Sequence, residues 1–479
     1  MQDKTDAPSL SFPAIFKLFF GFGLRAWGGP VAQIALIKDQ LVLQEKWITV
    51  KRFNRVLAVY QALPGPEATE LCCYFGYLAG GRVGSVIAGF AFVLPGFALM
   101  LLLSWLYTDY GLQNHYFVAS LKAVHPTVVA LVFRAVPKIG EHAVTNEDHS
   151  INYVLLWIAC FSAIQSVAFV PFYFTLFYST MFPLAVAAKL PQCCCCFFSA
   201  DKEAPSDTVM EVVDSTPPIS SSEPAVSNGD VPSSKTPNDP TKNGSPVTAA
   251  KAEVPKEEEN SVFGILLSSL FTICCIIGYV LYCVYRGIPG NPAIGFGHAS
   301  PSNINGAVFL VGLMGGLLTF GGAYTAIPFV REESVVIAKW LVGGQFLDGL
   351  AIGQMIPAPL VIFSTFVGFQ ANRFPGAILC TMGMFIPAFS FTAIGHLLFE
   401  RLVDYKPVNK ALDGLSACVV GLVAVTALQL LKDAVTHYMQ AVIFLIAVMV
   451  VFSQTNSLTS LCMVMCAIVA GQVLFTDRF

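Results

Sequence analysis

Charged residues are scarce in this chain. Only 12% of its 479 residues are Asp, Glu, Lys or Arg, whereas 55% are hydrophobic. A water-soluble helical protein needs a polar stripe on its surface helices, and stretches such as residues 86–106 and 441–452 have none. At about 1.5 Å per residue, a helix over residues 86–106 is long enough to cross about 30 Å of hydrocarbon. The chain is therefore predicted to be an all-α, multi-pass integral membrane protein.

Motifs of enzymatic sites are missing as well. The chain has no H-E-x-x-H, no G-x-S-x-G and no P-loop, and none of its seven histidines is paired at ligand spacing. These absences argue against the common nucleophile, metal and nucleotide sites, and against a pump driven by ATP. We therefore expect no enzymatic activity, no metal, no cofactor and no nucleic-acid partner. The N-terminus, MQDKTDAPSL, is polar and mixed in charge, so a cleaved secretory signal is not indicated.

Cysteine is present but lacks the spacing of a metal site. Most of the fourteen cysteines lie inside apolar segments, where a thiol acts as a small hydrophobic group. Cys193, Cys194, Cys195 and Cys196 instead stand in a row just before a polar stretch. Adjacent cysteines cannot surround zinc as C-x2-C pairs do. The cluster predicts juxtamembrane palmitoylation on the cytosolic face, with unmodified thiols as the alternative.

A polar stretch divides the chain. Residues 199–260 are rich in Pro and Ser, hold no aromatic residue, and carry five lysines against twelve acidic residues. This composition predicts a disordered acidic linker. The predicted organisation is a first repeat over residues 1–198, the linker over 199–260, and a connecting helix plus a second repeat over 261–479.

The two halves carry the same pattern. GLRAWGGPVAQIAL, Trp47 and QALPGPE in the first half correspond to GLLTFGGAYTAIPF, Trp340 and QMIPAPL in the second. The offset is 293 both from Trp47 to Trp340 and from Gln61 to Gln354. Paired repeats with Gly- and Pro-interrupted apolar segments at matching positions are typical of secondary transporters, whose site lies near the bilayer midplane.

Apolar spans are expected at matching positions in both halves. The predicted spans are 12–37, 53–80, 83–107, 116–137, 151–168 and 169–189, then 304–330, 341–371, 375–399, 409–431, 436–452 and 457–475, with one extra span at 262–285. Six crossings in each unit plus the extra helix give an inverted repeat, which we expect. If the Gln61 and Gln354 segments are re-entrant, each unit crosses five times and the copies are parallel.

Loop charges bear on sidedness, because Lys and Arg mark cytoplasmic loops. The loop over residues 38–55 is basic, whereas its counterpart has Arg331 and Lys339 offset by Glu332 and Glu333. Opposite bias in corresponding loops favours inversion. However, an inverted chain with the 38–55 loop inside places the cysteine cluster outside. The orientation therefore stays open at this stage.

The first interruption of each half is a glycine pair inside a span. Gly28 and Gly29, followed by Pro30, stand in the first half, and Gly321 and Gly322 in the second. Such residues free backbone groups, which are tolerated at membrane depth only where protein or a water-filled cavity surrounds them. Freed N–H groups at helix ends attract anions. The structural alternative is that these glycines only allow close helix packing.

The second interruption is a pair of prolines separated by one small residue, which cannot continue a helix. Gln61 and Gln354 precede the prolines by three residues and could turn uncharged N–H donors toward the same cavity, or merely bond to freed carbonyls. The prolines and glycine are Pro64, Gly65 and Pro66 in the first half, and Pro357 and Pro359 in the second.

Ionisable residues near the interruptions are few and are expensive at membrane depth. Arg25 lies three residues before the glycine pair, Glu67 and Glu70 follow the prolines, and Asp348 precedes Gln354 by six residues. Arg25 could bind an oxyanion in bidentate fashion, or could only neutralise Glu67. A carboxylate could carry the proton of a coupled cycle.

These residues resemble a known family. The runs GLRAWGGPVAQIALIKDQLV, QALPGPEATELCCYFGYLAG and LPGF, with Trp47 between the first two, are similar to the chromate ion transporter family in its long, two-domain form. Its FGG motif falls on Trp27–Gly29 and Phe320–Gly322, and its PGP motif on Pro64–Pro66 and Pro357–Pro359. Trp27 and Ala358 depart from those motifs, and Arg25 stands where the family is expected to have a small or hydroxyl residue, which leaves the exact substrate open.

The resemblance implies a secondary transporter of chromate, with sulfate as an isosteric oxyanion. An anion channel built on the same broken helices is the alternative. We expect a multi-pass protein of the plasma membrane rather than of an internal membrane. The oligomeric state is open, a homodimer included.

Overall fold

The structure is a computed structural model. It describes residues 7–63, 65–110, 115–145, 150–167, 172–187, 303–320, 322–403, 406–453 and 457–475. The predicted linker, the predicted span at 262–285, and Cys193 to Cys196 lie outside the described residues, as do Pro64 and Gly321.

The described part of the chain is helical and contains no strand, which confirms the all-α prediction. The first repeat contains α1 (Phe12–Leu24), α2 (Gly29–Ile37), the π-helix η1 (Lys38–Gln44), α3 (Val50–Ala62), α4 (Glu67–Asp109), α5 (His115–Val144), α6 (Tyr153–Val167) and α7 (Phe172–Ala187). The second contains α9 (Ile304–Leu317), η4 (Ala323–Thr325), α10 (Ala326–Arg331), the π-helix η5 (Glu332–Ile337), α11 (Gly343–Met355), η6 (Leu360–Ile362), α12 (Phe363–Val403), α13 (Lys406–Ala434), α14 (Tyr438–Ser453) and α15 (Ser457–Phe475).

Several helices are suited to a membrane. Among the described residues, four are long and apolar enough to cross one alone: Glu67–Asp109, His115–Glu141, Leu360–Ala393 and Lys410–Ala434. Five shorter helices are also apolar. These lengths and compositions agree with a polytopic membrane protein.

The two repeats share local geometry as well as sequence. Each has a π-helix followed by a lysine at positive φ, Lys46 at 56° and Lys339 at 54°. The next backbone contact also recurs, because the N–H of Trp47 donates to Leu41 and that of Trp340 donates to Ser334, at 2.9 and 2.8 Å. The two repeats are therefore alike even in the backbone conformation of single residues.

The helix α4 folds back on itself at its glycines. Gly80 and Gly81 leave helical geometry. A β-carbon added at Gly76 would meet Ala88 and the carbonyl oxygen of Gly84. Residues eight apart in a straight helix are separated by about 12 Å, so these contacts require a hairpin. In α12 the hairpin turns at Asn372 and Arg373, and Gly368 approaches Gly376.

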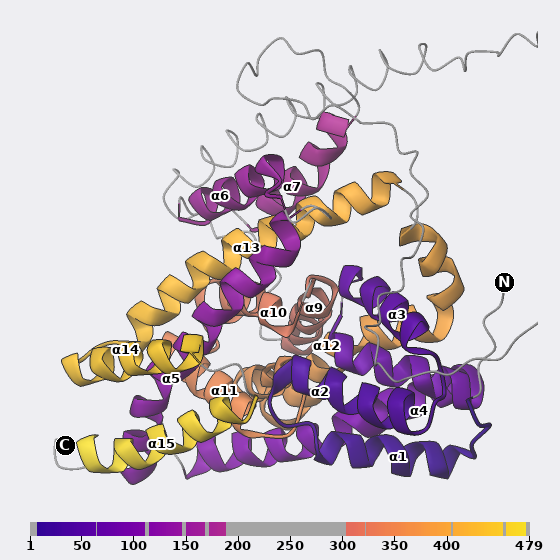
Figure 1. Ribbon diagram of the computed structural model, residues 1–479. Coiled ribbons are helices and arrows are strands. Elements are labelled where there is room, and N and C mark those ends of the chain that lie inside the picture. The colour runs from indigo at the N-terminus through magenta and orange to yellow at the C-terminus, as the bar shows by residue number, and fades with distance from the viewer. Residues whose placement is uncertain are drawn as a thin grey trace, which may run out of the picture. The chain divides into compact units, whose positions relative to one another are not determined.

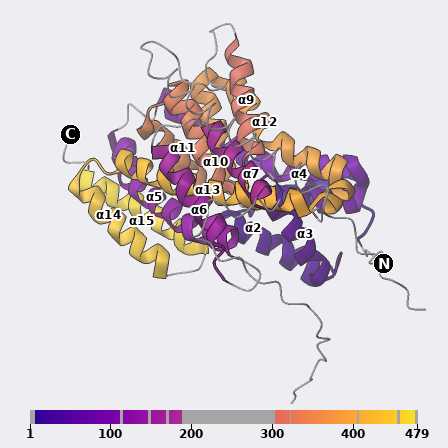
Figure 2. The same ribbon diagram turned by 90° about the horizontal axis from the view of Figure 1, so that it is seen from above.

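The last three helices of each repeat pack against those of the other. α5 lies against α14 and α15, whereas α13 lies against α6 and α7, as Figures 1 and 2 show. The hairpins α4 and α12 also pack together, with α1 on α4 and α9 on α12. The described helices of both repeats consequently belong to one compact unit.

Candidate functional site

The first interruption is a stretch of non-helical backbone between α1 and α2. Gly28 and Gly29 have φ values of 89° and 78°, in the left-handed region that favours glycine. A β-carbon added at Gly29 would meet no atom within 4 Å. By contrast, Gly312 and Gly316 lie against backbone carbonyl groups of α12. Close packing therefore explains the glycines of α9, whereas conformation explains Gly29.

The second interruption lies between the end of α3 at Ala62 and the start of α4 at Glu67. Gly65 has a φ of 152°, and Pro66 caps α4. The N–H of Gly65 donates to the carbonyl oxygen of Thr319 at 2.8 Å. Thr319 belongs to the other repeat, where it follows α9. This interruption is therefore tied to the first interruption of the second repeat.

The second repeat has the same two stretches. α9 ends at Leu317 and η4 begins at Ala323, with Gly322 at a φ of 127° between them. α11 ends at Met355 and η6 begins at Leu360, with Pro357 and Pro359 buried between them.

A buried glutamine makes the reciprocal connection. Nε2 of Gln33 donates to the carbonyl oxygens of Ala26 and Ala358, at 3.0 and 2.9 Å. Ala26 corresponds to Thr319, and Gly65 to Ala358, each at the offset of 293. Each first interruption is thus bonded to the second interruption of the other repeat. The two junctions between repeats are related in sequence but use different donors.

Two cations of α5 interact electrostatically with residues at these interruptions. Lys138 interacts electrostatically with Arg134 and with Glu67, the first residue of α4. Arg134 also interacts with Tyr324 of η4. The hydroxyl of Tyr324 accepts a hydrogen bond from Gln354 Nε2 at 3.4 Å. The Arg134–Lys138 pair therefore links the interruptions of both repeats, and its positive charge suits an anion.

The structure does not bring every predicted site residue to this place. Arg25 is exposed, with Nε donating to the Gly21 carbonyl oxygen at 3.0 Å and Nη2 to Gln40 at 3.3 Å. Gln61 is also exposed, near the end of α3. Glu67 is buried beside the second interruption, and its electrostatic partner is Lys138 instead of the predicted Arg25.

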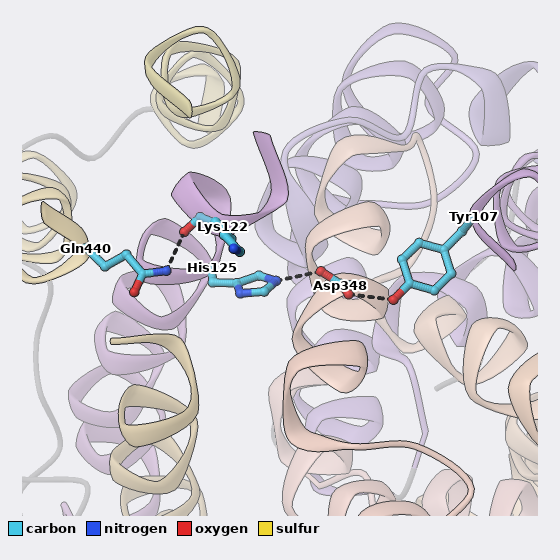
Figure 3. Close-up of polar contacts among 5 residues, drawn as sticks. All are labelled: Tyr107, Lys122, His125, Asp348 and Gln440. Carbon is cyan, nitrogen blue, oxygen red and sulfur yellow. Dashed lines mark hydrogen bonds and ion pairs between the residues drawn. The ribbon is translucent and has the colours of Figure 1, made fainter. Parts of the chain in front are cut away.

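Asp348 lies in a separate buried cluster (Figure 3). Its Oδ2 accepts a hydrogen bond from the hydroxyl of Tyr107 at 2.6 Å, and its Oδ1 lies 2.6 Å from Nε2 of His125. Asp348 comes from α11, Tyr107 from α4 and His125 from α5. The carboxylate therefore connects three helices, and both of its oxygens are engaged.

Sequence reasoning missed several of these residues. Arg134 and Lys138 stand four apart at the end of the span predicted over 116–137, a spacing that puts both on one helix face and is itself a signal. Tyr107, His125 and Gln33 carry no comparable signal, because their partners lie far away in sequence. Within the described ranges, no group of three or more His, Cys, Asp or Glu side chains could hold a metal ion.

Comparison with known proteins identifies relatives over the whole length. The model of the chromate transporter family matches residues 13–188 and 306–472. A chromate transport protein of Pseudomonas aeruginosa is 34% identical over 98% of this chain and 94% of its own length. One from Cupriavidus metallidurans is 23% identical over 92% of this chain and 88% of its own length. No solved structure matches.

The family match falls on both repeats and leaves out the stretch between them, which fits the long, two-domain form. Members of this family are transporters, not enzymes, in agreement with the absence of enzymatic motifs. The chain belongs to the chromate transporter family and is a membrane transporter.

Proposed function

We propose that the chain carries chromate, and the isosteric sulfate, across the membrane as a secondary transporter. The anion binds where the helix interruptions of the two repeats meet. The relatives named as chromate transport proteins support this substrate. Reciprocal bonding of the interruptions, Gly65 to Thr319 and Gln33 to Ala26 and Ala358, is the observation that carries the proposal.

The proposed site combines backbone dipoles with side-chain charge. α2 begins at Gly29 and α4 at Glu67, so freed N–H groups of both helices lie at interruptions, where the partial positive charge of a helix end favours an anion. Arg134 and Lys138 supply full charges, and Tyr324 and Gln354 supply hydrogen-bond donors. Arg134 can bind a tetrahedral oxyanion through two parallel N–H groups. Arg25 and Gln61 remain candidate contacts at the other end of the interruptions.

Movement follows from the way the repeats are joined. We propose that the repeats are inverted and that the Gly- and Pro-broken segments change partners as access alternates between the two sides. Opposite charge bias in the corresponding segments 38–55 and 331–339, which the structure shows as largely helical, supports inversion. The exchange of α5–α7 with α13–α15 supports a concerted motion of both repeats.

The transport reaction can be tested in proteoliposomes that contain the purified protein. Vesicles loaded with unlabelled chromate or sulfate should take up labelled chromate faster than empty vesicles, because a carrier exchanges one bound anion for another. Arg134→Gln should reduce this counterflow, whereas Arg82→Gln, a control at the exposed turn of α4, should not. Uptake that does not depend on the internal anion and does not saturate with external chromate concentration would support the channel alternative instead.

A further inference from the structure

Three buried carboxyl groups, those of Asp348, Glu67 and Glu70, differ in their surroundings. Asp348 is held by Tyr107 and His125. Glu67 has Lys138 as an electrostatic partner of opposite charge. Glu70, one turn further along α4, is fully buried, and neither of its carboxyl oxygens has a hydrogen-bond partner among the described residues. Of these three, only Glu70 has neither a hydrogen-bond partner nor a cation as electrostatic partner among the described residues.

Glu70 lies directly against the second interruption. A β-carbon added at Gly65 would be 2.5 Å from its Oε1 and 3.4 Å from Cβ of Ala388 in α12. Gly65 is also the residue that bonds to Thr319 of the other repeat. The carboxyl group thus lies against the junction of the repeats, where Gly65 also approaches the hairpin α12.

The groups that face Glu70 do not favour its ionised form. Glu67 and Cys73 come from α4 itself, and Tyr60 comes from α3. None of these is a cation, and the nearby Glu67 would repel a second negative charge. An unpaired carboxylate buried away from water is strongly unfavourable, so the group takes up a proton instead. In this conformation Glu70 is therefore a neutral carboxylic acid.

We propose that Glu70 carries the coupling proton and that the protein is a proton–oxyanion symporter. This inference rests on the proposed function, because it places Glu70 beside the anion at the interruption. When the cavity opens to water, the O–H bond of Glu70 breaks and its proton passes to a water molecule on that side. An ionised Glu70 repels a divalent anion, whereas the protonated acid does not. Proton and anion therefore bind together and leave together.

The test uses proteoliposomes in which the pH is set separately on each side. The vesicles have an alkaline interior, and the outside is then acidified. The parent protein should accumulate labelled chromate inside to a higher concentration than it reaches without the pH gradient. The uptake of protein-free vesicles is subtracted. Glu70→Gln mimics the protonated acid permanently. It should abolish this accumulation, while exchange of labelled for unlabelled anion, which moves no net proton, continues. Glu141→Gln, an exposed carboxyl at the end of α5, should accumulate chromate as the parent does.

The outcomes separate the two proposals. Parental accumulation by Glu70→Gln, or counterflow without any response to pH in the parent, would overturn the role of Glu70 and leave the transporter assignment standing. No counterflow in the parent would overturn the proposed function itself.

If Glu70→Gln does not fold, a measurement on the parent protein still tests the proposal. Sulfate stays fully deprotonated near neutral pH, so adding it to the intact protein in weak buffer with a pH indicator reports protein protons alone. Protons should be taken up as sulfate binds at alkaline pH. Binding without proton uptake would contradict the proposal.

Discussion

At the scale of single residues, the glycines of this chain have two separable roles. Gly312 and Gly316 allow helices to approach, whereas Gly29 and Gly322 adopt left-handed backbone with open space around them. A β-carbon in the left-handed region costs roughly 1–2 kcal/mol in conformational energy. At Gly29 that cost falls on the backbone of the proposed anion site and not on packing.

Gly29→Ala is accordingly expected to insert and fold but to lose most chromate flux, because the altered backbone no longer directs its N–H groups to the anion. Gly29→Val should do the same. Gly344→Ala is the matched control, since its added β-carbon also meets nothing and its φ is not left-handed. Flux per inserted molecule in proteoliposomes measures the effect. If Gly29→Ala transports chromate at the parental rate, the left-handed backbone at Gly29 is not required for transport.

We expect the Asp348 cluster to stabilise the fold, and substitution of its residues can measure this contribution. Tyr107→Phe removes one hydrogen bond to a buried carboxylate, and such bonds contribute about 1.5–3 kcal/mol. Tyr110→Phe, one turn later on an exposed tyrosine, is the control. Thermal unfolding in detergent should show a lower midpoint for Tyr107→Phe and little change for Tyr110→Phe. Equal midpoints would mean that Asp348 does not hold α4 to α11.

At the scale of helices, the exchange between repeats determines what can fold alone. α5 depends on α14 and α15 for packing, and α13 depends on α6 and α7. In a half protein, the apolar surfaces of these helices would lack their partner helices. They would be exposed to lipid or to the same surfaces of other copies.

Residues 1–198 and 261–479, produced together as separate chains, should therefore co-purify as a complex, because each supplies the helices that the other lacks. Each half produced alone should aggregate or be degraded. Size-exclusion chromatography in detergent distinguishes these outcomes. A monodisperse first half without its partner would contradict the exchange of helices.

The helices also show what sequence could and could not predict. Apolar runs predicted the helical class and most spans, because hydrophobic length is a local property. The contact between Gln33 and Ala358 joins residues 325 positions apart, so no local pattern could predict it. The predicted spans 53–80 and 83–107 appear as α3 and the hairpin α4, since Gly80 and Gly81 turn the chain without ending helical hydrogen bonding.

At the scale of the whole molecule, sidedness is a separate proposal. We propose that Cys193 to Cys196 are palmitoylated in the cytosol, which requires the linker to be cytosolic and, with six crossings in the first repeat, places residues 38–55 on the opposite side. Asn243 is the acceptor of the sequon Asn243-Gly244-Ser245, and Pro246 after it could block glycosylation by itself. The test therefore uses Pro246→Ala in a glycosylating cell.

That variant should show no glycan, and the parent should incorporate labelled palmitate at the cysteine cluster. A mass shift that glycosidase removes would place the linker outside. It would exclude cytosolic palmitoylation and agree instead with a cytoplasmic loop at residues 38–55.

The proposal that both repeats contribute to one anion site concerns the whole molecule. Equilibrium binding of labelled chromate to the purified protein tests it without any transport step. Removing a charged hydrogen-bond donor costs about 1.5–3 kcal/mol, which corresponds to roughly a 10- to 100-fold loss of affinity.

We expect Arg134→Gln to weaken chromate binding by that factor and Arg134→Lys to recover part of it, while Arg82→Gln binds as the parent does. Arg25→Ala, measured beside them, reports whether the other end of the interruption also contacts the anion. Parental affinity in Arg134→Gln, in protein that unfolds at the parental temperature, would contradict an anion site between the interruptions of the two repeats.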